Sequence, residues 1–206
     1  LACSLPESVP GTTVDRQCGS SQQAIHFAAQ AVMSGTQDVV IAGGVEAMSM
    51  VPIGASVKDG FDAGHGFPFN ADGIAARYPD VFFSQFTGAE LVAHKWNLSR
   101  EVLDAFALES HKKAKHATEM KFFDLEILPL AGKNEHNDTD LVLADEGIRF
   151  DASIDALAGL KTVVEGGVIT AGNASQITDG AAAIMICNDE GLKKIKSDPR
   201  AKITAL

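Results

Sequence analysis

Apolar residues recur at helical spacing in the segment that follows Cys18. They occupy positions 25, 28, 29, 32 and 33 of GSSQQAIHFAAQAVMSG, which begins at Gly19, and this spacing places them on one face of a helix. The pair Ser34-Gly35 predicts where that helix ends. A short β-branched run before Cys18 and the apolar run DVVIAGG after the helix predict two strands, the second one buried. The three elements predict a βαβ unit with a parallel sheet, and Cys18 at the carboxyl end of its first strand, where open α/β sheets bind ligands.

The pattern weakens from Val51 onward and then becomes helical again. The segment VPIGASVKDGFDAGHGFPFNADG is rich in Gly and Asp, which predicts a long excursion on the surface. Thr87 and Glu90 have the spacing of a capping box, and Ser99 predicts the start of another helix. Lysines around His111 predict a solvated basic face on that helix. Its apolar stripe comprises Leu103, Phe106, Ala107, Ala114 and Ala117.

Two more strands are predicted toward the end of the chain. A turn rich in Gly, Ala and Ser precedes the continuous apolar run from Ala181 to Cys187, which is typical of a buried strand. The residues ITAL at 203–206 predict the beginning of another strand. The sequence shows no internal repeat.

The net charge and the cysteines indicate which partners and which cellular compartment to expect. The net charge of −10 and the pI near 4.9 argue against nucleic acid, which needs clustered Lys and Arg, and favour a small molecule. Three widely spaced cysteines (Cys3, Cys18 and Cys187) predict neither a disulfide framework nor a zinc site, and favour a reducing compartment. Without a long apolar run or a signal segment, we expect a soluble protein of the cytoplasm or an organelle matrix, with no membrane partner. The chain begins with Leu1 rather than Met, which indicates that part of the protein lies upstream.

Cys18 is the strongest candidate for chemistry. A thiol at the first turn of a helix lies near unpaired N–H groups and the positive end of the helix dipole, and both favour the thiolate. The small residues Gly19, Ser20 and Ser21 leave room for a thioester, and the Cys18 N–H is a candidate oxyanion donor. From spacing alone, a buried and inert cysteine is the alternative interpretation.

Two long motifs resemble the signatures of the thiolase family. Residues 14–52, VDRQCGSSQQAIHFAAQAVMSGTQDVVIAGGVEAMSMVP, resemble the active-site segment, and residues 166–183, GGVITAGNASQITDGAAA, resemble the second signature. Between them EGIRFDASIDALAGL, residues 146–160, is similar to part of the family's loop domain. The resemblance therefore covers nearly the whole chain.

The resemblance implies an α/β fold of the layered thiolase type, present only in part. We expect an incomplete N-terminal βαβ domain and a mostly helical loop domain. Along the chain this predicts part of the N-terminal domain with the nucleophile (1–50), the loop domain (51–165), a return strand of the N-terminal domain (166–188) and the start of a truncated C-terminal domain (189–206).

The same resemblance implies acyl transfer between thiols, in fatty-acid β-oxidation or in the reverse condensation. Cys18 corresponds to the nucleophile that attacks a 3-ketoacyl-CoA, releases acetyl-CoA and passes the shortened acyl group to a second CoA. Arg149 corresponds to a position near the nucleotide of CoA, and Ala171, Gly172 and Ser175 to positions along its pantetheine arm. From the residues alone, a solvated arginine and an ordinary tight loop are the alternatives. CoA and acyl-CoA are then substrates, no cofactor or metal is permanently bound, and a homodimer or homotetramer is expected.

The chain also departs from the family pattern. It contains no Asn-Glu-Ala-Phe segment, no Gly-His-Pro segment and no late cysteine in a Gly-rich loop. We therefore expect the isolated chain to be weakly acylated at best and not to turn over, because the groups that activate the nucleophile and move the α-proton are missing. Small-substrate members have a His-Met pair where this chain has Ser84, Gln85 and Phe86, which resembles degradative members that take bulkier acyl chains.

Two other functions remain open at this point. One is a catalytically silent module for CoA binding or oligomerisation. The other is a ketoacyl synthase, a related condensing enzyme with a nucleophilic cysteine, over which the segment GNASQITDGAA favours a thiolase.

Overall fold

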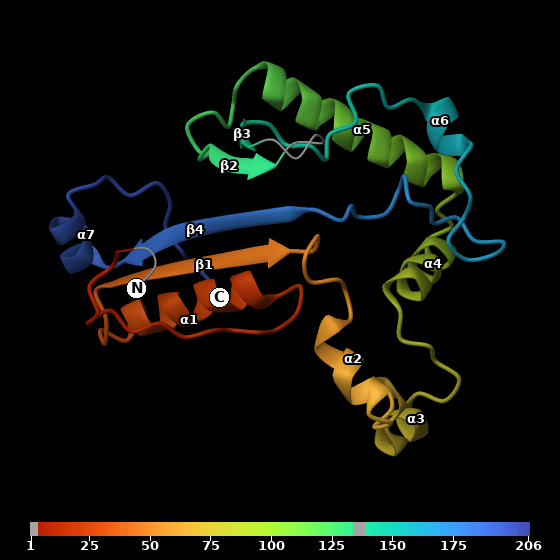
Figure 1. Cartoon of the computed structure of the whole chain (residues 1–206), viewed down its shortest axis with the longest axis horizontal. Helices are drawn as coiled ribbons and strands as arrows, with labels where there is room; N and C mark the ends of the chain where they lie inside the picture. The colour runs from red at the N-terminus through yellow and green to blue at the C-terminus, as the bar shows by residue number, and fades with distance from the viewer. Residues whose placement is uncertain (1–3, 134–138) are drawn as a thin grey trace. The chain divides into compact units, whose positions relative to one another are not determined.

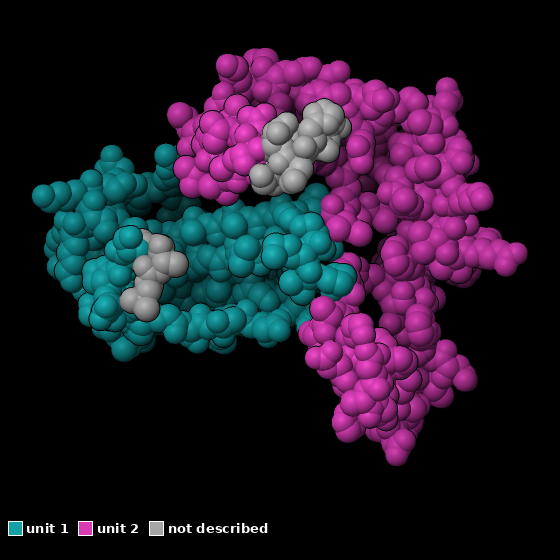
Figure 2. Space-filling model, in the orientation of Figure 1, with its two compact units in different colours: residues 1–52, 178–206 teal, residues 53–177 magenta. Residues whose placement is uncertain are grey.

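The computed structural model describes residues 4–133 and 139–206, and Cys3 lies outside them (Figure 1). The chain divides into two units, shown in different colours in Figure 2. The first unit comprises Leu1–Pro52 and Thr178–Leu206, and the second comprises Ile53–Ile177.

The first unit is built from helix α1 (Ser20–Met33), strands β1 (Val39–Ala47) and β4 (Asp179–Cys187), and helix α7 (Asp189–Ile195). The predicted helix after Cys18 is confirmed, and it ends where expected, with Gly35 in the left-handed region at φ 75°. Helix α1 lies along one face of the two strands (Figure 1). The core between them is formed by Ala28, Ala29, Val32, Ala42 and Ile186.

The pairing of β1 differs from the prediction. Strand β1 pairs antiparallel with β4, so that Val39 lies opposite Cys187 and Ala47 opposite Asp179. In the part of the chain that the structure describes, no strand precedes Cys18, and only an isolated bridge joins Arg16 to Cys18. The expected parallel βαβ pairing is therefore wrong, because apolar periodicity identifies a strand without identifying its partner. The mixed α/β class is confirmed.

Both strands were predicted to be buried, and this is also wrong. Of their residues only Ala42 and Ile186 are buried, whereas Ile41, Val45 and Met185 are 52%, 79% and 51% exposed. Helix α1 covers one face of the sheet, which leaves apolar side chains on the other face in contact with solvent. Residues 203–206 form no strand.

The Asp179 carboxylate, at the start of β4, binds the turn that follows β1. The Ser49 N–H donates to Asp179 Oδ1 at 2.9 Å, and the Ser49 hydroxyl donates to Asp179 Oδ2. The hydrogen bond from the Ser49 hydroxyl has the largest effect and the one from the Ser49 N–H the next, and together they hold the pKa of Asp179 below its usual value.

Helix α7 is tied to the residue before β1. Asn188 caps α7 by accepting from the Gly191 N–H at 2.8 Å, and its amide donates to Asp38 Oδ1 at 3.0 Å. Lys194 reaches Asp38 Oδ2 at 2.6 Å. The hydrogen bond from Lys194 lowers the pKa of Asp38, and the reciprocal contact raises the pKa of Lys194. Since both groups are exposed to solvent, this ion pair adds little to stability.

The second unit is mostly helical. Its elements are α2 (Ala55–Asp62), the 3-10 helix η1 (Pro68–Asn70), α3 (Asp72–Arg77), α4 (Gln85–Lys95), α5 (Arg100–Glu119), strands β2 (Leu130–Lys133) and β3 (Thr139–Val142), and α6 (Ile154–Ala158). Strands β2 and β3 form an antiparallel pair. The excursion after Val51 thus contains two short α-helices, neither of which has a buried residue. Among residues 4–133 and 139–206, no helix has both the length and the apolar character that crossing a bilayer requires.

The two predicted helix starts in this unit have different outcomes. Ser99 caps α5 as expected, because its hydroxyl accepts from the Val102 N–H at 3.4 Å. The capping box of Thr87 and Glu90 is wrong. Helix α4 begins at Gln85, with Ser84 as its cap, three residues before Thr87, and the Glu90 carboxylate bonds to a distant segment.

Removing the Ser49 hydroxyl tests the Asp179 contact. A carboxylate whose pKa is depressed in the folded state stabilises that state above the unfolded pKa, about 3.9 for Asp, and this contribution is lost as the pH falls through the folded pKa. We expect Ser49→Ala to lower the thermal midpoint near pH 7, and the difference from the wild type to shrink below about pH 4. Thermal unfolding followed by circular dichroism measures both effects.

The matched control is Ser197→Ala, at an exposed serine outside this contact. It should show no pH-dependent difference from the wild type. A Ser49→Ala difference that stayed constant down to about pH 3 would contradict the assignment.

Candidate functional site

Cys18 lies at an exposed turn immediately before α1. Its thiol is free and exposed, so the alternative of a buried cysteine is wrong, and its reactivity stays a prediction. The turn is closed by the Gly19 N–H, which donates to the Arg16 carbonyl at 3.1 Å. Gly19 then serves as the N-terminal cap residue of α1.

The residue before Cys18 has an unusual backbone conformation. Gln17 has a φ of 53°, in the left-handed region that costs a non-glycine residue about 1 to 2 kcal/mol. Hydrogen bonds on both sides hold it there. Asp15 Oδ1 accepts from the Gln17 N–H at 3.1 Å, and the Ser20 hydroxyl donates to the Gln17 carbonyl at 2.7 Å. These hydrogen bonds fix the turn in the conformation in which the Cys18 thiol is exposed.

The small residues after Cys18 have structural roles of their own. Ser20 accepts from the Arg16 N–H at 2.8 Å in addition to its bond to Gln17. Ser21 packs against β1 at Gly44, where a Cβ would overlap the Ser21 hydroxyl. The start of α1 therefore approaches the sheet closely because Gly44 has no side chain.

The second signature is held by side chains from α4 and α5. The Val168 N–H donates to both carboxylate oxygens of Glu90 in α4, at 3.0 Å to Oε1 and 3.1 Å to Oε2. The Ile169 N–H donates to Glu90 Oε1 at 2.9 Å. The carboxylate thus satisfies two successive backbone donors of the loop. Charge-assisted bonds of this kind are stronger than bonds between neutral groups.

A buried carboxylate organises the rest of this loop. Asp104 of α5 is only 1% exposed, and it accepts from Arg100 Nε at 2.6 Å and from Asn173 Nδ2 at 2.9 Å. Asn173 also donates to the Val168 carbonyl at 3.1 Å and accepts from the Thr170 N–H at 2.8 Å. Asn173 therefore closes the loop on itself and connects it to α5.

Of the predicted pantetheine residues, Gly172 has a clear packing role. A Cβ at this position would lie 2.5 Å from both Leu157 Cδ2 and Leu160 Cδ1, so a larger residue would displace the ends of these two leucine side chains. Ala171 and Ser175 are exposed. Both remain accessible to a ligand, and their contact with CoA stays a prediction.

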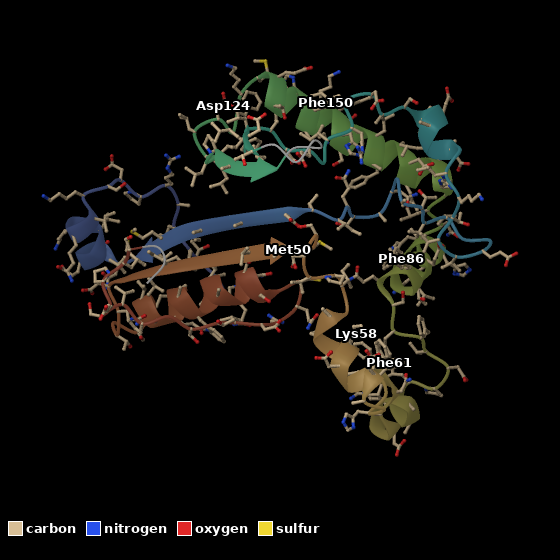
Figure 3. The ribbon with its side chains drawn as sticks, in the orientation of Figure 1. Met50, Lys58, Phe61, Phe86, Asp124 and Phe150 are labelled. Atoms are coloured by element: carbon tan, nitrogen blue, oxygen red, sulfur yellow. The ribbon has the colours of Figure 1, made fainter. Side chains whose placement is uncertain are left out.

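Arg149 lies in the same unit as these residues. It is exposed, and its N–H donates to His111 Nδ1 of α5 at 3.1 Å. The next residue, Phe150, lies beside α5 (Figure 3), with Lys115 Nζ 5.9 Å from the centre of its ring. The amide of Gln176 donates to the Gly147 carbonyl at 2.6 Å and so joins the Arg149 segment to the second signature. Cys18 belongs to the other unit.

Comparison with known proteins identifies the family. The family described as "Thiolase, N-terminal domain" matches residues 1–190. The chain belongs to the thiolase family. Its sequence is 46% identical over 204 residues to a steroid 3-ketoacyl-CoA thiolase of Mycobacterium tuberculosis, covering 98% of this chain and 49% of the relative. It is 37% identical over 208 residues to a 3-ketoacyl-CoA thiolase of Aliivibrio fischeri, covering 100% of this chain and 51% of the relative. The chain therefore spans about half the length of the curated relatives it matches.

Sequence reasoning missed several residues that hold the segments carrying the predicted site residues. Glu90 was assigned to a capping box, and His111 to a solvated basic face, although His111 accepts a backbone hydrogen bond and is half-buried. Asp104 interrupts the apolar stripe of α5, one residue after Leu103, and a carboxylate in such a position needs a partner. Arg100 lies four residues earlier on the same helix, and this i, i+4 spacing of opposite charges could have predicted it as the partner.

Two open hollows in the described residues lie elsewhere. One is formed by α7 and residues 196–198, and the other lies beside β2 and β3. Neither contains Cys18 or any of the predicted CoA residues.

Truncating Asp104 tests the network that holds the second signature. Asp104→Ala leaves the Arg100 guanidinium and the Asn173 amide without their buried acceptor, so we expect the free energy of unfolding to fall by about 3 to 5 kcal/mol. Urea unfolding followed by circular dichroism measures this. Glu109→Gln, at an exposed position of the same helix, should change it by no more than about 0.5 kcal/mol. A loss for Asp104→Ala as small as that of the control would show that the network contributes little.

Proposed function

We propose that this chain carries the acyl-accepting cysteine of a CoA-dependent acyltransferase of the thiolase type. The observation that carries the proposal is the position of Cys18, exposed at a hydrogen-bonded turn directly before α1. There the thiol lies at the start of the helix and is open to an incoming thioester.

The proposed reaction proceeds in two acyl transfers, first from carbon to the Cys18 sulfur and then from Cys18 to CoA. The Cys18 sulfur forms a bond to the keto carbon of a 3-ketoacyl-CoA, the bond between the keto carbon and the α-carbon breaks, and acetyl-CoA leaves after its α-carbon takes a proton. The thiol of a second CoA then attacks the acyl-Cys18 thioester, which releases the shortened acyl-CoA and the free cysteine. Covalent catalysis divides a difficult carbon–carbon step into two easier ones.

The proposed CoA surface belongs to the second unit. We assign Arg149 to the nucleotide end, where a guanidinium stacks on a purine or meets phosphate. Ala171, Gly172 and Ser175 are assigned to the pantetheine arm. The support is that the Arg149 segment and the second signature are joined by the Gln176 hydrogen bond, and that Arg149, Ala171 and Ser175 are exposed.

For the substrate we propose a 3-ketoacyl-CoA bulkier than acetoacetyl-CoA, cleaved in fatty-acid β-oxidation. One relative is named a steroid 3-ketoacyl-CoA thiolase and another a 3-ketoacyl-CoA thiolase. Phe86 lies in the first turn of α4 (Figure 3), and its side chain is 43% exposed. An aromatic ring at this position favours an apolar acyl group. We further propose that residues 51–165 form the loop domain of the family and that residues 166–188 return to the N-terminal domain. We also propose that the whole protein is a homo-oligomer of the cytoplasm or an organelle matrix.

A second candidate function is a silent CoA-binding module. It is favoured by one observation: all the predicted CoA residues lie in one folded unit, and Cys18 belongs to the other. Binding by the second unit would then not require chemistry at Cys18.

Acylation of the chain distinguishes the two candidates. After incubation with acetyl-CoA, we expect intact-mass spectrometry to find one acetyl group on the wild type and on Cys187→Ala, and none on Cys18→Ala. Cys187 is the matched control because it is also a free thiol, half-buried at the end of β4. CoA binding without any adduct on the wild type would favour the silent module.

Thiolysis tests whether these 206 residues suffice for turnover. With acetoacetyl-CoA and CoA, we expect no catalytic cycle beyond the first acylation, because the sequence lacks the family's histidine segment and its second cysteine. Loss of the enolate absorbance measures the rate. Turnover that approached the rate of a full-length thiolase would contradict this expectation.

A further inference from the structure

Gln176 connects two segments that lie far apart in the sequence. It follows Ser175 directly, and its Nε2 donates to the carbonyl of Gly147 at 2.6 Å, across 29 residues of chain. Gly147 in turn lies two residues before Arg149. The hydrogen bond therefore joins the segments to which the two ends of CoA are assigned.

The Gly147 side of this contact is closely packed. A Cβ at Gly147 would lie 2.5 Å from Gln176 Oε1 and 3.1 Å from Asp145 Oδ1. The Gly147 N–H donates to the same Asp145 oxygen at 2.8 Å. The backbone of Gly147 is thus held between the Gln176 amide and the Asp145 carboxylate, and any larger residue would push the amide away.

The other side of the segment is held by helix α5. The Arg149 N–H donates to His111 Nδ1 at 3.1 Å. Only Ile148 lies between the two attachment points, at the Gly147 carbonyl and the Arg149 N–H. The backbone of Arg149 is therefore fixed at both ends, although its side chain is exposed.

We propose that Gln176 is a positioning residue, which acts through Arg149 to set where the nucleotide half of CoA is held relative to Ser175. This inference rests on the proposed CoA surface. A ligand that engages two segments at once binds well only if their separation is fixed before it arrives, because ordering a loose segment lowers the affinity. Gln176 supplies this order without itself being assigned to CoA.

The test compares CoA with pantetheine, which lacks the nucleotide. Gln176→Met keeps the length of the side chain and its neutral charge but removes the donor. In isothermal titration calorimetry on the 206-residue chain, we expect Gln176→Met to weaken CoA binding about fivefold, the equivalent of one net hydrogen bond. Pantetheine affinity should stay unchanged. Gln30→Met, at an exposed glutamine of α1, should leave both affinities unchanged.

A double-mutant cycle shows whether Gln176 acts through Arg149. We expect Arg149→Met to remove the preference for CoA over pantetheine, and Gln176→Met to have no further effect in that background. Additive losses would overturn the inference, as would equal weakening of CoA and pantetheine by Gln176→Met, or no effect at all. The assignment of Arg149 would survive each of these results. A wild type that binds both ligands equally, or an Arg149→Met variant that binds CoA like the wild type, would overturn the CoA assignment of Arg149 and this inference with it.

Discussion

The second unit depends on a carboxylate that is almost completely removed from solvent. Asp104 projects from α5 and is 1% exposed, and a buried charge is tolerated only when it is paired and hydrogen-bonded. Arg100 and Asn173 supply these partners, and Arg100 also donates to the Leu160 carbonyl at 3.2 Å. The Asp104 carboxylate, through Arg100 and Asn173, therefore connects α5 to the residues after α6 and to the second signature.

The first unit depends instead on close approach of backbones. Helix α1 packs through alanines, and Gly44 allows Ser21 to lie against β1. The turn before the helix is then closed by hydrogen bonds of Asp15, Ser20 and Gly19, which hold Gln17 in a left-handed conformation. The position of Cys18 is thus a consequence of how the helix begins, and the cysteine side chain itself contributes little to it.

The proposed CoA surface of the second unit follows one pattern. Side chains of neighbouring helices bond to the backbone of a loop, and the loop presents small or exposed residues for the ligand. Glu90, Asp104, His111 and Gln176 all act on backbone groups, directly or through Asn173. In such a site the residues assigned to the ligand and the residues that hold them are different, and both sets are needed for an ordered surface.

The sequence by itself determined helices α1 and α5, with the end of α1 at Ser34 and the cap of α5 at Ser99, the family, and Cys18 as the candidate nucleophile. These depend on local spacing and on motifs, which the linear chain carries in full. Only the tertiary structure decided that β1 pairs antiparallel with β4, that Glu90 bonds to the second signature and not to its own helix, and that His111 holds Arg149. Each of these joins residues that are tens of positions apart or more. The physical reason is that a strand or a carboxylate reveals in sequence that it needs a partner, whereas the partner is selected by packing across the fold.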